Sequence, residues 1–157
     1  MSSLRVDTIL GESGAERRGL MTYAIICDQK TEDVDGGTFS SGDWRTRDLN
    51  HTIADPDGIV SGVNDQFTLQ AGSYYIEAYA PCFGVNSNVA RLYNVTADSV
   101  VEYGSHAYAR VASGDVGDSK AWVHARVTLT GATTFKIEHR CAVSRSTNGF
   151  GVGHGFG

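Results

Sequence analysis

The side chains best suited to chemistry in this chain are its histidines and carboxylates. The five histidines fall on separate predicted elements: His51, His106, His124, His139 and His154. Three carboxylates have the chemical type of a glycosidase pair, but no spacing selects two of them: Glu77, Asp98 and Glu102. The sequence also has no Gly-x-Ser-x-Gly elbow, phosphate-binding loop or dinucleotide fingerprint. We therefore assign no catalytic residue and expect no enzyme activity.

Carboxylates are densest in the predicted loop Gln29–Gly37, which carries Glu32, Asp33 and Asp35. Calcium takes several oxygen ligands from one loop, but this spacing matches no calcium loop. A solvated acidic loop is the simpler interpretation, and we assign no cofactor to it.

The three cysteines, Cys27, Cys82 and Cys141, each lie in or beside an apolar stretch. They cannot all pair within one chain, and no CxxC or HxxxH spacing indicates a zinc site. We expect buried free thiols that pack as small hydrophobic groups, which fits assembly in a reducing cytoplasm.

Length and composition favour one soluble domain. The chain has 157 residues, 41% of them hydrophobic and 20% charged, enough for a single packed core. A net charge of −5 argues against a nucleic-acid partner. No signal peptide and no apolar run long enough to cross a bilayer is recognisable, so no membrane insertion is expected. With 19 glycines, two prolines and no helical period, the sequence predicts an all-β fold.

Two strands joined by a turn, within 65–81, would position the outward-facing side chains. Phe67 and Leu69 alternate with polar residues before the turn at 70–72. The second strand directs one set of side chains inward, Tyr74, Ile76, Ala78 and Ala80, and the other set outward, Tyr75, Glu77 and Tyr79.

Two later strands show the same alternation. In 120–129, alanines, valines and a leucine face inward while Trp122 and His124 face outward. In 134–144, His139 shares the apolar face, which suggests a hydrogen-bonded core or interface histidine. The nearly continuous apolar run 20–28 predicts a strand covered on both sides. Two short strands are also predicted around residues 104–106, at 100–103 and 107–111, and a turn is predicted at 86–88. Together these strands favour a two-sheet sandwich.

The outward aromatic residues are unusual for a monomer. Exposed patches of this kind mark interfaces, and a closed ring of identical subunits is the simplest way to cover them. We therefore take Tyr75, Tyr79, Trp122 and His124 as subunit-interface candidates. We also expect Arg47, beside Asp48, to form an ion pair at a subunit border.

Several ordered motifs between residues 36 and 144 resemble one protein family. They are Gly37-Thr38-Phe39, Trp44–Leu49, Phe67–Tyr74, Ala90–Asn94 and Ile137–Cys141. The stretch with Ala71-Gly72 and Tyr74 resembles the C1q/TNF-like jelly roll. The whole run resembles the jelly-roll tip domains of bacteriophage tail fibres and related virion fibres. The resemblance implies an all-β two-sheet jelly-roll sandwich, a homotrimer and a place in the virion.

The resemblance also divides the chain into three parts. Residues 1–19 form an N-terminal arm that would attach to other virion proteins or form a stem, against the alternative of a frayed terminus. Residues 20–145 form the jelly-roll knob. Residues 146–157 form a glycine-rich tail, in which Phe150 and Phe156 join the interface candidates. This tail is either loose, simply packed or threaded along the trimer axis, where three copies of His154 would face one metal ion.

A trimeric knob that contacts a host-surface glycan or protein is the function implied first. Loops at the exposed end of a sandwich commonly carry binding residues. The candidates are Glu32, Asp33, Asp35, Asn86, Asn88, His106, Asp115 and Asp118. One alternative is a capsid decoration or head-fibre protein without a receptor. A further alternative, from another class, is a C1q-like secreted binding module.

Overall fold

The computed structural model describes residues 22–112 and 115–154, without the side chain of Asp115. In this part of the chain the fold is all-β and its strand pairs are antiparallel, as the sequence predicts. No helix in the described ranges could cross a membrane. Residues 1–19, Phe156 and the side chain of Asp115 lie outside the described residues, so the predictions made for them stay predictions.

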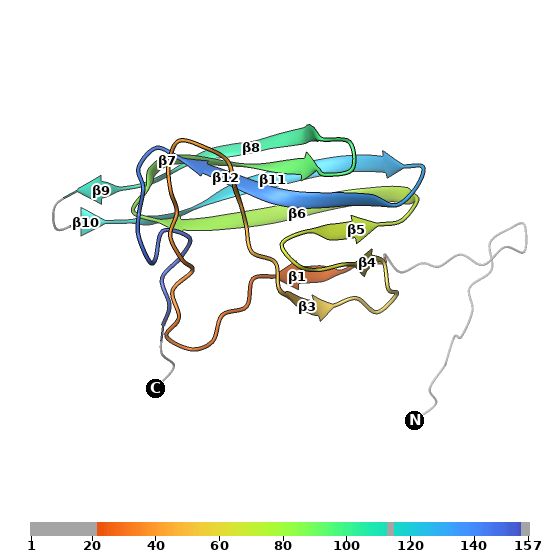
Figure 1. Cartoon of the computed structure of the whole chain (residues 1–157), viewed down its shortest axis with the longest axis horizontal. Helices are drawn as coiled ribbons and strands as arrows, with labels where there is room; N and C mark the ends of the chain where they lie inside the picture. The colour runs from red at the N-terminus through yellow and green to blue at the C-terminus, as the bar shows by residue number, and fades with distance from the viewer. Residues whose placement is uncertain (1–21, 113–114, 155–157) are drawn as a thin grey trace, which may run out of the picture.

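Twelve strands follow one another along the described chain (Figure 1). They are β1 (Ile25–Cys27), β2 (Arg45–Thr46), β3 (His51–Ala54), β4 (Val60–Ser61), β5 (Phe67–Leu69), β6 (Gly72–Phe83), β7 (Asn86–Asn94), β8 (Ser99–Ala109), β9 (Val111–Ala112), β10 (Asp115–Val116), β11 (Asp118–Leu129) and β12 (Thr133–Cys141).

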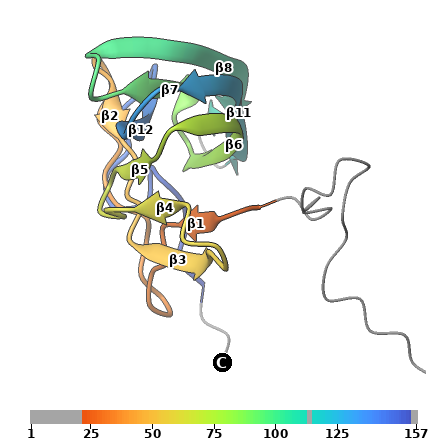
Figure 2. The ribbon, with the colours of Figure 1, turned by 90° about the vertical axis from the view of Figure 1, so that its right-hand side faces the viewer.

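Two layers of strands face each other (Figure 2). One layer has the order β4-β5-β12-β7-β8, with β2 also paired to β12, and the other consists of β6 and β11. β6 pairs with β11 over its whole length, from Gly72 opposite Leu129 to Phe83 opposite Asp118. The consecutive strands β5 and β6 thus run beside β12 and β11, respectively. The β5–β6 and β11–β12 connections pass from one layer to the other at the same end.

The main core lies between these layers and follows from the period of two in the strands. The predicted inward residues of β11, Ala121, Val123 and Ala125, are buried and pack against Phe67 and Phe135 from the other layer. Those two rings lie 5.8 Å apart. The alternation read from the sequence is therefore confirmed for the long strands.

A second core cluster lies beside the C-terminal segment. Its buried members are Phe39, Cys82, Val85, Ala109 and Cys141, and Phe150 packs against them. Cys82 and Cys141 are buried free thiols, as predicted, and burial raises the pKa of Cys141 to about 11. Cys27 is also free but only half-buried.

The segment that follows β12 is folded onto its own chain as far as His154. Phe39 and Arg145 exchange backbone hydrogen bonds, and the Gly36 N–H donates to the Gly151 carbonyl at 2.9 Å. A Cβ added at Gly149 would lie 2.6 Å from the Cβ of Phe39, so glycine permits this close approach. Residues 146–154 therefore continue the packed domain rather than forming a separate tail.

Three predictions about the strands are wrong. The run 20–28 is not covered on both sides in its described part, because β1 pairs only with β3 there and Tyr23 and Ile25 are half exposed. The two short strands predicted on either side of residues 104–106 are one strand, β8. The predicted turn at 86–88 is the start of β7.

The predicted Arg47–Asp48 ion pair is also wrong. Asp48 pairs with Lys30, whose Nζ lies 2.7 Å from Oδ2. Arg47 is 7% exposed and lies under Phe150, with its guanidinium carbon 4.4 Å from the ring centroid and Nη2 donating to the Phe150 carbonyl. Burial lowers the pKa of Arg47 to about 10. No local pattern predicts that Phe150 folds back to cover this residue.

Candidate functional site

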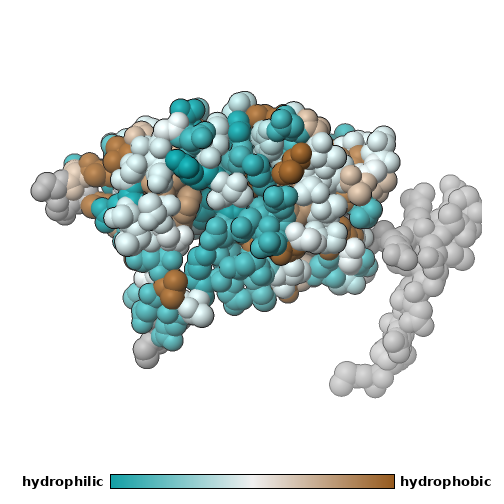
Figure 3. Space-filling view, viewed as in Figure 1, coloured by the Kyte–Doolittle hydropathy of each residue, from teal (hydrophilic) through white to brown (hydrophobic). Residues whose placement is uncertain are grey.

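The outer face of β6 and β11 carries a row of exposed aromatic residues. Tyr75 is 65% exposed, Tyr79 51% and Trp122 46%, and His124 is exposed beside them. These are the strand residues that the sequence predicted to face outward, and the structure brings all four together. By contrast, in the view of Figure 3 hydrophilic residues gather across the middle of the domain and hydrophobic ones are scattered.

Strand register explains why the rings are in contact. The N–H of Phe83 on β6 donates to Gly149, away from β11, and the N–H of Trp122 donates to Ser105 Oγ, away from β6. Since alternate residues of a strand point their backbone groups to opposite edges, Tyr79 and Trp122 form a non-hydrogen-bonded pair. Such pairs bring side chains closest, and the two rings meet edge to face at 4.9 Å.

Hydrogen bonds hold the polar ends of the row in place. Tyr75 Oη lies 2.6 Å from Nδ1 of His124, and the His124 ring stacks on Trp122 at 6.0 Å with an interplanar angle of 5°. Tyr79 Oη donates to Glu77 on the same face. The row therefore forms a fixed surface instead of separate mobile rings, which lowers the entropy cost of covering it.

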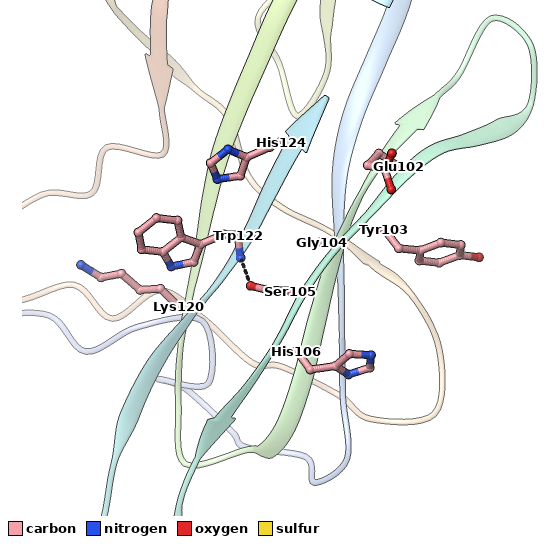
Figure 4. Close-up of a pocket in the computed structure, with 8 residues that line it drawn as sticks. All are labelled: Glu102, Tyr103, Gly104, Ser105, His106, Lys120, Trp122 and His124. Carbon is pink, nitrogen blue, oxygen red and sulfur yellow. Dashed lines mark hydrogen bonds between the residues drawn. The ribbon is translucent and has the colours of Figure 1, made fainter. Parts of the chain in front are cut away.

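A shallow depression of about 530 Å³ borders this row, between β8 and β11 (Figure 4). Lys120, Trp122 and His124 point to one side of β11 there, and Glu102, Tyr103 and His106 come from β8. At Gly104 the two strands approach so closely that an added Cβ would lie 2.0 Å from the Trp122 carbonyl oxygen. Glycine at this position lets β8 lie against the edge of β11.

Chemically, the row suits contact with another large surface. Tyrosine and tryptophan supply apolar area together with a hydrogen-bonding end, which is why they are enriched at protein interfaces. We call the four residues Tyr75, Tyr79, Trp122 and His124 the aromatic face.

Two further tyrosines are exposed that were not among the predicted interface residues. Tyr103 and Tyr108 on β8 are both more than half exposed, and Tyr103 lies 5.9 Å from the ring of Trp44. Their position on one continuous strand was hidden by the predicted break at 104–106. The correct strand boundary would have placed them on a face.

The proposed receptor residues are only partly together. Glu32 and Asp33 are exposed, but Asp35 is half-buried and accepts a hydrogen bond from the Gly153 N–H at 2.8 Å. Asp118 is exposed opposite Phe83, and Asn86 starts β7 nearby, accepting from the N–H of Val111. His106 is exposed on β8 rather than in a loop.

The placement of Asn88 in an exposed loop is wrong. It is buried in β7, where Oδ1 lies 3.1 Å from Nε2 of His139 and Nδ2 donates to Ser119. His139 is a fully buried core residue, as its apolar face predicted. Burial, aided by the charge of Arg47, lowers the pKa of His139 to about 3.

Phe150 of the C-terminal segment does not join the aromatic face. Phe150 stacks on Phe39 at 4.3 Å within its own chain, because Gly149 and Gly153 let the backbone lie close to Phe39 and Val34. Phe150 therefore packs within its own chain, and its contact with another subunit stays a prediction. His154 is exposed, and within the described residues no group of three potential ligands could hold a metal ion. An axial metal stays a prediction that needs further copies.

Comparison with known proteins returned no match to a protein-family profile and none to a curated protein sequence.

Proposed function

We propose that this protein is a virion fibre protein whose knob is a homotrimeric jelly roll that contacts the host surface. The observation that carries the proposal is the aromatic face, because three of its four rings keep about half or more of their surface exposed on one chain. A closed ring of identical subunits would cover these residues by repeating one contact between each pair of neighbours.

Topology supports the jelly-roll part of the proposal. A jelly roll is two antiparallel sheets wound from a pair of chain segments that run side by side. Here β5–β6 runs beside β12–β11, with β5 paired to β12 in one layer and β6 paired to β11 in the other. Two motifs of the phage-fibre resemblance lie in these strands: 67–74 covers β5 and the start of β6, and 137–141 lies in β12.

We propose that the receptor binds at the end of the sandwich that carries Asn86, Asp118 and the β9–β10 hairpin (Figure 1). The exposed carboxylates Glu32 and Asp33 lie on a loop outside the sheets. Carboxylate and amide oxygens at these positions would accept hydrogen bonds from sugar hydroxyl groups or from a protein surface.

Assembly is tested first, by light scattering on the full-length protein. A mass three times that of one chain supports the trimer, and a monomeric mass at all concentrations contradicts it. Trp122→Ser should lower the mass, because it removes the largest ring of the aromatic face. Thr130→Ser, at an exposed turn away from that face, is the control.

Receptor contact is tested separately, by binding of fluorescently labelled protein to host cells. Saturable binding that Asp118→Lys weakens supports a receptor knob. A stable trimer that binds no cells would instead favour the capsid decoration or head-fibre alternative.

A further inference from the structure

One long strand edge is open beside a groove. Within the described residues, β6 pairs only with β11, so its other edge has no partner strand. A groove of about 980 Å³ runs along that edge, lined by Tyr74, Ile76 and Ala78 on β6 and by Ile26 on β1. Unpaired strand edges of this length are normally covered, because they invite pairing with other chains.

The backbone groups at this edge can be assigned. Because the Phe83 N–H points away from β11, strand alternation directs the N–H groups of Ser73, Tyr75, Glu77 and Tyr79 the same way. Pro81, next in this series, has no N–H to offer, and proline within a sheet is found at edge strands. Four donors with their carbonyls thus face the groove in a regular row.

The opposite wall of the groove is also uncovered. In the part of the chain that the structure describes, β1 pairs only with β3, and Tyr23 and Ile25, both lining the groove, are half exposed. This apolar segment has the composition of a strand covered on both faces, which is why the sequence predicted it so. Among the described residues, no extended segment therefore lies between β1 and β6, where one could cover both walls.

A buried charge lies at the base of the groove. Arg47 lines it, and the Nη1 of this residue is buried with no hydrogen-bond acceptor among the described residues. Peptide carbonyl oxygens brought into the groove would compensate this charge better than an apolar ligand would.

We propose that residues 4–10 of this protein form a β-strand along the open edge of β6, filling the groove between β6 and β1. In Leu4-Arg5-Val6-Asp7-Thr8-Ile9-Leu10, positions 4, 6, 8 and 10 share one face with three apolar side chains. That face would lie in the groove. On the other face, Arg5 would complement Glu77, which lies on the outer side of β6.

Chain length permits this arrangement. The described chain starts at Thr22, which itself lines the groove. Residues 11–21 would bridge up to about 36 Å when extended, enough to return along β6 of the same chain or to reach a neighbouring copy. The stretch 4–10 also matches 73–79 in length, the part of β6 that carries the four free donors.

Amide-resolved hydrogen exchange on the full-length protein tests the proposal. The amides of Ser73, Tyr75, Glu77 and Tyr79 should exchange slowly, like those of Tyr74 and Ile76 that point to β11. Val6→Pro removes one N–H and disfavours a strand. In this variant the first set of amides, those of Ser73, Tyr75, Glu77 and Tyr79, should exchange at least tenfold faster. The exchange of the second set, Tyr74 and Ile76, should not change. Ala15→Pro is the matched control, because residue 15 lies between residues 4–10 and the start of the described chain at Thr22. Both sets of amides should stay protected in this variant.

Two results would overturn the proposal. Fast exchange of the first set in the unmodified protein means that the edge is open. Protection that persists in Val6→Pro means that something other than residues 4–10 covers it. The proposal does not depend on the trimer, because these amides report on the edge at any oligomeric state, and light scattering on the same samples reports on assembly.

Discussion

Two regions whose aromatic residues are predicted from the sequence to lie at a subunit interface differ in the structure. In the C-terminal segment, Phe150 stacks on Phe39 and covers Arg47 within one chain. On the aromatic face, Tyr79 contacts Trp122 and Tyr75 contacts His124, yet Tyr75, Tyr79 and Trp122 remain about half or more exposed. The first region completes the domain, while the second leaves surface for another molecule.

The difference comes from what surrounds each aromatic ring in the chain. Gly149, next to Phe150, has no side chain and lets the backbone reach the Phe39 cluster. The rings on β6 and β11 alternate with alanines and valines that are already buried, so strand geometry forces them outward. An aromatic residue opposite a packed strand face is therefore the better indicator of an interface.

The largest effect is expected from Phe39→Ala. Phe39 is fully buried and contacts both Phe150 and His139, so the variant should lose about 3–5 kcal/mol of unfolding free energy. Urea denaturation measures this loss. Tyr108→Ala, at an exposed ring on β8, is the control and should change the value by about 0.5 kcal/mol. Equal losses would remove the distinction between a packed ring and an exposed one.

The buried His139 should make the stability of the fold depend on pH. His139 is neutral when folded because burial lowers its pKa from 6.5 to about 3. The unfolded chain binds the proton more readily, so stability should fall as pH drops from about 6.5 towards 3, with a slope up to about 1.4 kcal/mol per pH unit. Urea denaturation at several pH values should show a reduced slope in His139→Gln. The exposed His124→Gln is the matched control; an unchanged slope in His139→Gln would contradict this account.

Gly149→Ala tests whether the C-terminal segment needs the close backbone approach that glycine permits. The added methyl group would lie 2.6 Å from the Phe39 Cβ and 2.7 Å from the Arg145 carbonyl oxygen. The resulting shift should cost about 1–3 kcal/mol. Gly131→Ala, where an added Cβ meets nothing within 4 Å, should leave thermal stability nearly unchanged. If the two variants have the same melting temperature, the C-terminal segment is not packed against Phe39 as described.

The smallest effect on the fold itself is expected from Trp122→Ser. If the aromatic face is covered by other copies, the melting temperature of the unmodified protein should rise with protein concentration. The variant should lose most of this rise while its melting temperature at low concentration changes by only about 1–3 °C, since a surface change of about 0.5 kcal/mol is small. Differential scanning calorimetry over a hundredfold concentration range measures both the rise and the melting temperature at low concentration. If the rise persists in the variant, the aromatic face is not the subunit interface.

Local alternation predicted much of this molecule. The all-β class, the inward residues of β6 and β11, the buried His139 and the aromatic face all follow from side chains two apart sharing a face. The sequence could not predict which distant segments meet. The return of Phe150 over Arg47, the burial of Asn88 beside His139 and the uncovered walls of the β1–β6 groove depend on tertiary contacts that no local pattern encodes.

The most direct test of the central claim is the solvent access of Trp122 in solution. Acrylamide quenching of fluorescence in the Trp44→Phe variant reports on this ring alone, because the chain has only two tryptophans. If the aromatic face is covered by identical subunits, quenching should be far weaker than expected for a ring that is 46% exposed on a single chain. Quenching typical of a half-exposed tryptophan would contradict the account.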